Sequence, residues 1–325
     1  SEDIVTLQYA TDERPPTLDP HAVNPTNTNA FFTFPEHGYE TLVYYDYPPE
    51  KEGKITLGPE LASKVPSSEN GLITNDGKTI EFPLKEGVKF HTGEEMTAED
   101  VRYSWDRVQK MGLNPTGKQL DAMVDSMEVV DDYTFRVTLA QKTTPIFLNS
   151  VLVSPGASVV SKAAVEEHGG VQEGSPNKWM GQNSAGTGPY MLGEGTPNSV
   201  YWAPHPEGYH GETDVDAVRQ NIVGSASSRI SQLQRGDLDG MYLSVGDVSE
   251  AEGKDGIEIL SEPQINPGGI NFNYNIPYDR DSVQQLTGGN DTIPSDFFTD
   301  RAVRRAFVYS IPWGEFIDSV LSGYG

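Results

Sequence analysis

The sequence has no cysteine and no long apolar run, and each absence excludes a class of protein. Without cysteine the chain forms no disulfide, no thiolate nucleophile and no cysteine-ligated zinc site. The longest apolar stretch, residues 146–153, is interrupted by Asn149 and Ser150 and is too short to cross a bilayer. The opening residues, SEDIVTLQYATDE, lack the basic and apolar segments of an export signal. We therefore expect that such a signal has been removed or never existed.

Basic residues are also scarce, with 23 Lys and Arg against 48 Asp and Glu and a formal net charge of −25. The acidic residues are spread along the whole chain, and such a surface repels phosphate backbones, so we expect no nucleic acid as a partner. The excess fits an ordinary acid-leaning soluble protein. It also fits a halophile whose carboxylates hold hydrated cations, and the modest apolar content favours this second interpretation.

At 325 residues the chain exceeds the usual size of one domain, so we expect at least two compact units. The stretch DIVTLQYA alternates as a strand does. The stretch SSRISQLQRGDLDGMYL predicts a helix with Ile230 and Leu233 inward, a stop at Gly236 and a strand through Met241. Helix followed by strand, repeated, indicates an α/β arrangement. Helices are also predicted from about Asp300 to Tyr309 and after Pro312.

Two β-hairpins are predicted in the first half of the chain. GKTIEFPL and GVKF are separated by Glu86 and Gly87, and MEVVDDYTFRVTLA carries Asp131 and Asp132 between two alternating runs. Between them lies VKFHTGEEMTAEDVRYSWDRV, in which one histidine stands beside two acidic pairs. Thr97 is a typical N-cap, and Glu99 and Asp100 are acids of a first helical turn. Val101, Trp105 and Val108 follow as one apolar stripe, so we interpret His91 and its acidic neighbours as structural.

The sequence matches none of the common catalytic motifs. A phosphate-binding loop ending at Gly77–Thr79 would need glycine where Leu72 stands, and neither H-E-x-x-H nor G-x-S-x-G occurs. The closest metal-like cluster is HPEGYH, with His205, Glu207 and His210. Pro206 and Gly208 between them favour a turn at the end of a strand, with both histidines on the surface. A loop could still bend the three side chains around a cation. With 48 acids, a carboxylate pair for glycoside hydrolysis also stays open.

Several segments, in order and nearly end to end, together resemble one family: the large extracellular substrate-binding proteins of ABC importers that carry dipeptides, oligopeptides, nickel and some sugars. The segments that carry the resemblance are TLDPH, YETLVYYD, PELASKV, DGKTIEFPLKEGVKFHTGEEMTAEDVRYSWDRV, VVDDYTFRVTL, VVSKAAVEEHG, GTGPYML, HPEGYHG, ISQLQRGDLDGMYL, INFNYN and DRAVRRAFVYSIPWGEFIDSVLSGYG. The sequence departs from the family pattern at Ser310-Ile311-Pro312, where Ala-Ile-Asp is common.

The resemblance implies an α/β, periplasmic-binding-protein-like fold of class II, with two lobes and an extra α+β accessory domain. Residues 1–46 and 184–266 would form lobe I, residues 47–183 the accessory domain, and residues 267–325 the start of lobe II. Family members generally continue for a couple of hundred residues beyond GYG. We therefore expect lobe II to be incomplete in this sequence, and residues after Pro267 to be the least ordered or to dock on another chain.

The resemblance also implies a function. A hinged clamp outside the cell would capture di- or oligopeptides and deliver them to the permease subunits of an ABC importer, making and breaking no bond and needing no cofactor. The protein would be a monomer, with tail-mediated association as an alternative, and it would lie in the periplasm or be lipid-anchored on the extracellular face with its signal removed. The position of three segments in the family pattern nominates seven ligand-binding residues: Asn24, Thr26, Asn27, Tyr242, Ser244, Asn271 and Asn273.

Three alternatives stay open beside peptide transport. The same fold could bind nickel, another metal chelate or an oligosaccharide, and an extracellular hydrolase could use a carboxylate pair. A ligand-sensing regulator would need a basic DNA-reading domain, and the sequence has none.

Overall fold

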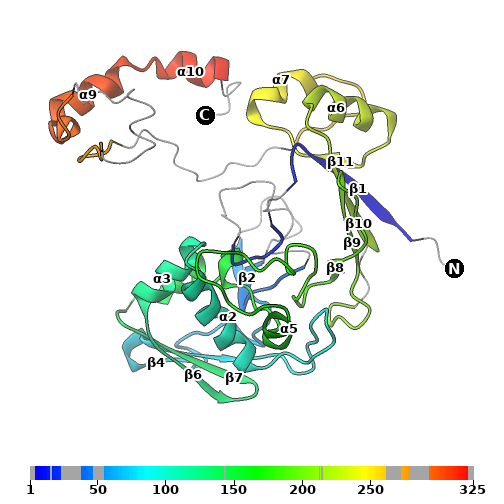
Figure 1. The fold of residues 1–325 in the computed structure, drawn as a ribbon, viewed down its shortest axis with the longest axis vertical. Coiled ribbons are helices and arrows are strands. Elements are labelled where there is room, and N and C mark those ends of the chain that lie inside the picture. Colours follow the sequence, from blue (N-terminus) through cyan, green and yellow to red (C-terminus); the bar gives the residue numbers. More distant parts are fainter. Residues whose placement is uncertain are drawn as a thin grey trace. The chain divides into compact units, whose positions relative to one another are not determined.

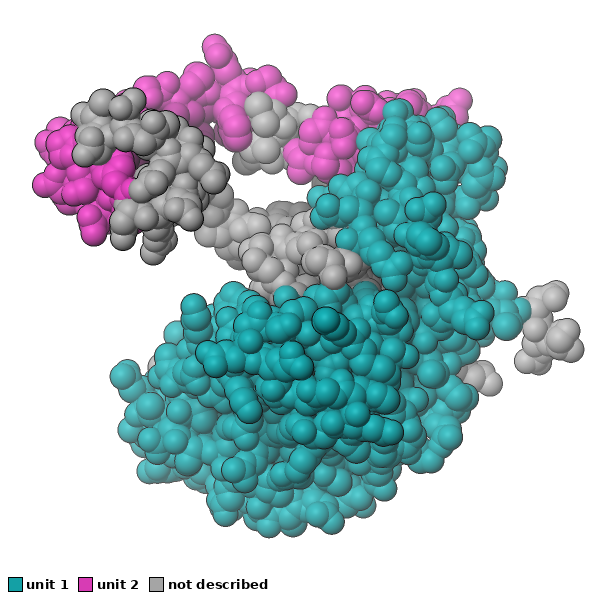
Figure 2. Space-filling model, in the orientation of Figure 1, with its two compact units in different colours: residues 1–242 teal, residues 243–325 magenta. Residues whose placement is uncertain are grey.

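A computed structural model describes residues 4–14, 17–22, 38–46, 55–142, 144–211, 213, 215–260, 272–278 and 293–320. The chain divides into two compact units, Ser1–Tyr242 and Leu243–Gly325, which Figure 2 distinguishes by colour. The predicted behaviour of the tail after Pro267 stays a prediction, and residues 268–271, 279–292 and 321–325 of that tail lie outside the described ranges.

A five-stranded mixed sheet forms one part of the first unit, in the order β11-β1-β10-β9-β8 (Figure 1). Strand β1 (Thr6–Thr11) pairs in parallel with both β10 (Ala217–Ile222) and β11 (Gly240–Met241). Strands β9 (Ser199–Pro204) and β8 (Tyr190–Leu192) continue the sheet in antiparallel pairs. The strands predicted at DIVTLQYA and at Met241 are therefore confirmed.

A second sheet of four strands has the order β4-β5-β7-β6. Its strands are β4 (Ile73–Thr74), β5 (Thr79–Pro83), β6 (Val124–Asp131) and β7 (Thr134–Leu139). The predicted β6–β7 hairpin is confirmed. The other predicted hairpin is wrong, because β5 pairs with β4 and β7 instead of with residues 88–90. Those residues turn sharply, and the backbone N–H of Phe90 bonds to the carbonyl of Glu94. A separate two-stranded ribbon joins β2 (Val43–Asp46) to β3 (Thr56–Pro59).

Helix α2 (Ala98–Met111) begins at Thr97 as predicted and ends at Gly112 in the left-handed conformation. The Asp100 carboxylate accepts a hydrogen bond from the backbone N–H of Thr97 at 3.0 Å, and Glu99 pairs with Lys162. Glu99 and Asp100 thus serve the helix start, whereas Glu95 accepts hydrogen bonds from the Gly87 N–H at 2.9 Å and the Tyr133 hydroxyl at 2.5 Å. The other described α-helices are α3 (Pro115–Met123), α4 (Thr144–Ile146), α5 (Lys162–Glu167), α6 (Ala226–Arg235), α7 (Val248–Ala251), α9 (Arg301–Ser310) and α10 (Trp313–Val320).

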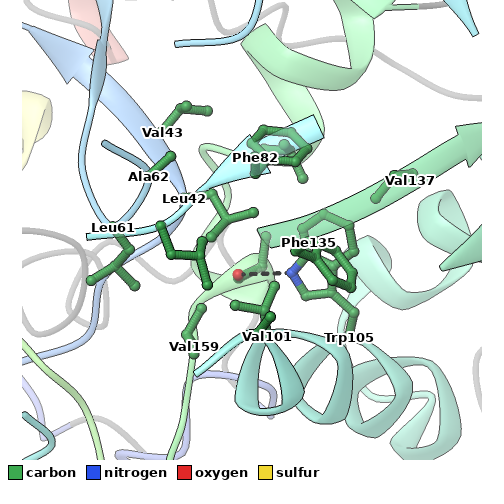
Figure 3. Packing of buried hydrophobic residues seen from close by; sticks show 14 of the residues in the cluster. Leu42, Val43, Leu61, Ala62, Phe82, Val101, Trp105, Phe135, Val137 and Val159 are labelled. Carbon is green, nitrogen blue, oxygen red and sulfur yellow. Dashed lines mark hydrogen bonds between the residues drawn. The ribbon is translucent and has the colours of Figure 1, made fainter. Parts of the chain in front are cut away.

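Trp105 of α2 lies in the hydrophobic core between the helices and the four-stranded sheet (Figure 3). Its ring meets Phe135 edge-on at 5.2 Å and Phe147 at 6.0 Å, and its Nε1–H donates to the carbonyl of Ala157 at 3.3 Å. The predicted stripe of Val101, Trp105 and Val108 is fully buried. A second core, under the five-stranded sheet, gathers residues such as Tyr39, Val160, Val200 and Trp202.

The TLDPH segment ends in a buried ion pair with α2. The Arg107 guanidinium contacts both carboxylate oxygens of Asp19, at 2.8 and 2.5 Å, and all three side chains of this group, including His21, are buried. Arg107 also donates to Nδ1 of His21 at 2.8 Å, so the other ring nitrogen carries the proton and donates to the carbonyl of Ser158 at 2.9 Å. Burial opposes ionisation of Asp19, but the Arg107 partner outweighs it and lowers the pKa of Asp19.

The buried His21 predicts that mild acid weakens the fold. Burial, followed by the charge of Arg107, lowers the pKa of His21 to about 4 from 6.5. The unfolded chain then binds a proton more readily, so stability is lost as the pH falls from about 6.5 towards about 4. Between pH 7 and 5.5 we expect this residue alone to lower the free energy of unfolding by about 1 kcal/mol.

Urea unfolding across this pH range measures the effect, and the variant His21→Gln should show a shallower pH dependence whatever its absolute stability. His91 contributes in the same direction, because burial lowers its pKa to about 4 as well. An unchanged slope in His21→Gln would contradict the assignment of a neutral His21 to the folded state.

The GTGPYML segment connects the two parts of the first unit through its glycines. The carbonyl of Gly186 accepts from the backbone N–H of His91 at 2.8 Å, and the N–H of Gly188 donates to the carbonyl of Gly38 at 3.2 Å. A Cβ atom added at Gly186 would collide with the carbonyl oxygen of Gly38 and lie 2.8 Å from the ring of Tyr39. Glycine is therefore required here by the close approach of two backbone segments.

Gly186→Ala is expected to lower the free energy of unfolding by about 1–3 kcal/mol, because two backbone segments must move apart. Gly314→Ala is a matched control, since a Cβ there meets nothing within 4 Å. That control lies inside α10 and should be neutral or slightly stabilising. Equal stability of the two variants in urea unfolding would contradict the packing of the GTGP turn.

The second unit holds the aromatic contacts of the INFNYN segment. Phe272 packs against Phe298 at 5.1 Å and Phe307 at 6.0 Å, and Asp300 caps α9 as its side chain accepts from Ala302 N–H at 2.7 Å. The predicted helices at Asp300–Tyr309 and after Pro312 are confirmed.

Candidate ligand-binding site

Three parallel strands of the five-stranded sheet end at the same edge of the first unit. Strand β1 ends at Thr11, β10 at Ile222 and β11 at Met241. In open α/β sheets, ligands bind outside the carboxyl ends of the strands. This carboxyl edge is therefore the candidate binding site of the unit.

Buried polar side chains support the carboxyl edge from within the sheet. The Gln220 amide donates to the Thr11 hydroxyl at 3.2 Å, and that hydroxyl donates to the carbonyl of Glu13 at 3.2 Å. Thr11 and Gln220 are both buried. Buried polar groups of this kind fix the direction of the chain as it leaves a strand.

Arg229 of α6 holds the loop after β10. Its guanidinium donates to the carbonyls of Val223 and Gly224, at 2.6 and 3.2 Å, although the side chain is buried. Its Nε atom has no hydrogen-bond partner among the described residues. Beneath the carboxyl edge, this positive charge has no carboxylate partner in the part of the chain that the structure describes.

Tyr9 lies close to this charge and to Tyr242. Burial, followed by the influence of Tyr242, raises the pKa of Tyr9, and the nearby charge of Arg229 opposes the shift. Tyr9 therefore keeps its proton and can donate a hydrogen bond. Its ring lies over Gly240, where a Cβ atom would come within 3.2 Å of the ring. Hydroxyl donors beside a cation suit the carbonyl and carboxylate oxygens of a peptide.

The predicted ligand-binding residues fall in three places. Tyr242 directly follows β11, is half-buried, and its backbone N–H donates to the carbonyl of Ala10 at 2.9 Å. In the second unit the Ser244 hydroxyl donates to Asp247 at 2.6 Å, and the Asn273 side chain accepts from Asn275 N–H at 3.0 Å. The structure thus gives Ser244 and Asn273 local turn partners. Asn24, Thr26, Asn27 and Asn271 lie outside the described residues.

The sequence alone did not predict three residues at the carboxyl edge: Tyr9, Gln220 and Arg229. Each is an ordinary strand or helix residue, and only the pairing of β1 with β10, across more than 200 residues, places them at one edge. A polar residue inside an alternating strand, as Gln220 is, was the one signal available.

A second polar cluster lies at Glu40, a buried residue whose carboxylate accepts three hydrogen bonds. The donors are Thr187 at 2.7 Å, Tyr209 at 2.6 Å and His210 at 3.0 Å. Burial opposes its ionisation, but the His210 partner and the other donors outweigh that effect and lower the pKa of Glu40. Glu40 therefore joins residues 187, 209 and 210 as an internal anchor of the first unit.

Glu60 neighbours this anchor and behaves in the opposite way. Burial, followed by the negative charge of Glu40, raises the pKa of Glu60 well above its usual value, although Thr41 donates two hydrogen bonds to it. Two neighbouring carboxylates in a buried place ionise in separate steps. Because protein donors occupy both oxygens of Glu40, this pair has a structural role.

The two histidines and the glutamate of the HPEGYH segment each contact a different residue. His210 bonds to Glu40, Glu207 forms an ion pair with Lys89, and His205 lies edge-on to His91 with ring centroids 4.8 Å apart. Over the ranges that the structure describes, no group of three or more His, Cys, Asp or Glu residues is placed to hold a metal ion. The structure thus gives each of these three residues a different partner.

The mixed α/β fold, with parallel strands ending at a polar edge, defines a periplasmic-binding-protein-like domain. Residues 56–325 match the family model of the bacterial extracellular solute-binding proteins, family 5. The chain belongs to this family. None of the helices in the described ranges is long and apolar enough to cross a membrane.

The matched relatives include binding proteins with different cargoes. A probable D,D-dipeptide-binding periplasmic protein, DdpA of Escherichia coli K12, is 28% identical over 327 residues, which cover 100% of this chain and 56% of DdpA. Heme-binding protein A of Haemophilus influenzae is 29% identical over 256 residues, covering 72% of this chain and 45% of that protein. The chain therefore spans about half the length of the curated relatives it matches.

A solved structure of similar fold is the periplasmic binding protein DppA from Helicobacter pylori in complex with the peptide STSA. It superposes with a TM-score of 0.69 at 19% sequence identity, covering 98% of this chain and 58% of that one. At this identity the likeness concerns the fold, which agrees with the predicted fold class.

Proposed function

We propose that this protein is the substrate-binding component of an ABC importer and that it captures di- or oligopeptides outside the cytoplasmic membrane. The observation that carries the proposal is a similarity to a D,D-dipeptide-binding protein that extends over 100% of the chain. The carboxyl ends of three parallel strands, β1, β10 and β11, support a ligand site at this edge.

The proposed mechanism is closure of a hinged clamp. A ligand that contacts two lobes gains interactions in the closed state that the open state lacks, so it raises the population of the closed state. The closed form then docks on the permease subunits, and no bond is made or broken. We propose residues 1–46 and 184–266 as lobe I, residues 47–183 as the accessory domain and residues 267–325 as the start of lobe II. The five-stranded and four-stranded sheets, each with its own core, support a division within the first unit, residues 1–242.

We further propose that the protein acts as a monomer on the outer side of the membrane, held there by a lipid anchor, and that its acidity is a halophilic adaptation. The net charge of −25 supports the last point, because dense salt would screen the mutual repulsion of the carboxylates. Refolding in concentrated KCl is then expected to give a more stable protein than refolding in low-salt buffer. Equal stability in the two buffers would contradict halophilic adaptation.

The experiment that tests the function is calorimetric titration of the protein, expressed from its complete gene, with a panel of dipeptides. We expect saturable binding with one peptide per chain and no hydrolysis product. Ser244→Leu should weaken binding at least tenfold if Ser244 faces the peptide. Ser249→Leu is the matched control, since Ser249 is an exposed serine of α7.

Two outcomes would overturn the proposal. Release of a product from peptide or glycoside substrates would favour a hydrolase. Saturable binding of a nickel chelate or an oligosaccharide, with none of any peptide, would keep the family but replace the cargo.

A further inference from the structure

One face of α9 gathers three arginines in an otherwise acidic chain. Arg301, Arg304, Arg305 and Val308 follow at intervals of three and four residues, so they share one side of the helix. With Tyr309 and the aromatic residues Phe272 and Tyr274 they line a groove of about 560 Å³. This groove lies entirely within the second unit. The groove is open to solvent, and none of the α9 residues that line it is buried.

The charge of this groove is not neutralised within the described part of the chain. Acidic residues outnumber basic ones by 48 to 23, yet none of the three arginines forms an ion pair with a described carboxylate. Arg304 donates to the carbonyls of Phe298 and Thr299, at 2.6 and 2.8 Å, and so holds the start of α9. Within the described ranges, Arg301 and Arg305 face no carboxylate, and Arg305 donates to the Tyr309 hydroxyl at 3.5 Å.

Aromatic rings give the groove a planar, apolar wall. The Arg304 guanidinium lies 4.8 Å from the centre of the Tyr274 ring, and the Arg305 guanidinium lies 5.7 Å from that of Tyr309. A guanidinium stacked on a ring keeps its in-plane N–H groups for an acceptor such as a carboxylate. Phe272 is fixed from behind by Phe298 and Phe307.

We propose that this groove binds a small organic anion, with its carboxylate between Arg301 and Arg305 and its apolar body against Tyr274 and Val308. Arginine is the residue best suited to hold a carboxylate through two parallel hydrogen bonds. A net charge of −25 repels anions from the rest of the surface, so the groove is the place where a carboxylate gains most. The proposal does not depend on peptide transport by the carboxyl edge of the first unit.

Titration of the whole chain with 3-phenylpropionate and with its neutral amide tests the proposal. Calorimetry or ligand-observed NMR measures the binding. We expect the acid to bind saturably and the amide at least tenfold more weakly. A second pair, N-acetylphenylalanine and its amide, distinguishes a peptide chain end from a free acid as the source of the carboxylate. Tighter binding of N-acetylphenylalanine supports the site and assigns it to peptide ends, and tighter binding of phenylpropionate supports the site and assigns it to free acids.

The double variant Arg301→Gln/Arg305→Gln should weaken binding of the acid at least tenfold, while Arg304 is kept because it holds backbone carbonyls. Arg102→Gln/Arg235→Gln removes the same charge from exposed helix positions of the first unit and should change the affinity less than twofold. Equal losses in both double variants would overturn the proposal by assigning the effect to net charge. Equal binding of acid and amide, or no saturable binding of either acid, would overturn it directly.

Discussion

Arg107→Ala is expected to lower the free energy of unfolding by about 3–5 kcal/mol, because it leaves the buried Asp19 carboxylate without its cation. The side chains of both residues are 0% exposed, so water cannot replace the lost partner. His21 loses the donor to its Nδ1 atom in the same step. Chemical denaturation followed by circular dichroism measures the change.

Arg102→Ala is the matched control for this prediction. Arg102 stands on the same helix, is 48% exposed and lies 3.7 Å from Asp106, so its loss should cost less than about 1 kcal/mol. The double variant Arg107→Leu/Asp19→Leu removes both charges and should recover part of the loss, since no buried charge is left alone. If Arg107→Ala were no worse than Arg102→Ala, the buried ion pair would be disproved.

Trp105→Ala is expected to cost about 3–5 kcal/mol of unfolding free energy, since it empties the centre of the larger core. The indole is fully buried, and it touches the rings of Phe135 and Phe147 (Figure 3). Trp105→Phe keeps most of the apolar contact but leaves the carbonyl of Ala157 without its donor, so it should cost about 1–3 kcal/mol. The same denaturation measurement ranks the two variants.

Trp313→Ala is the control for Trp105, because this indole is 42% exposed. Its replacement should change the unfolding free energy by less than half of the Trp105→Ala effect. Comparable losses at the two positions would contradict the placement of Trp105 in the core.

Local features of the fold were predictable because their signals lie within a few residues. The Thr97 cap and the Val101–Trp105–Val108 stripe predicted α2, and Asp131 with Asp132 predicted the β6–β7 hairpin. The failed hairpin at Glu86–Gly87 had the same local signal. That hairpin does not form because β5 pairs with β7, about 55 residues further along the chain. A local sequence pattern contains no information about such a distant partner.

Long-range features could not be predicted in the same way. The parallel pairing of β1 with β10 brings Tyr9 and Gln220 to one edge, and no pattern in either segment names the other as its partner. An arginine in a helix is usually exposed, so the sequence alone does not predict that Arg107 is buried. Its burial depends on the ion pair with Asp19 of the distant TLDPH segment. The predicted site residues came from family position, and only Tyr242 is described next to the carboxyl edge.

We propose that the protein carries a small solute without changing it. Purification from the native host under non-denaturing conditions, followed by release and mass spectrometry of the bound molecules, tests this proposal. Peptides of a few residues, in about equal amount with the protein, are the predicted result. A protein that carries no solute and turns over a peptide or glycoside would contradict it.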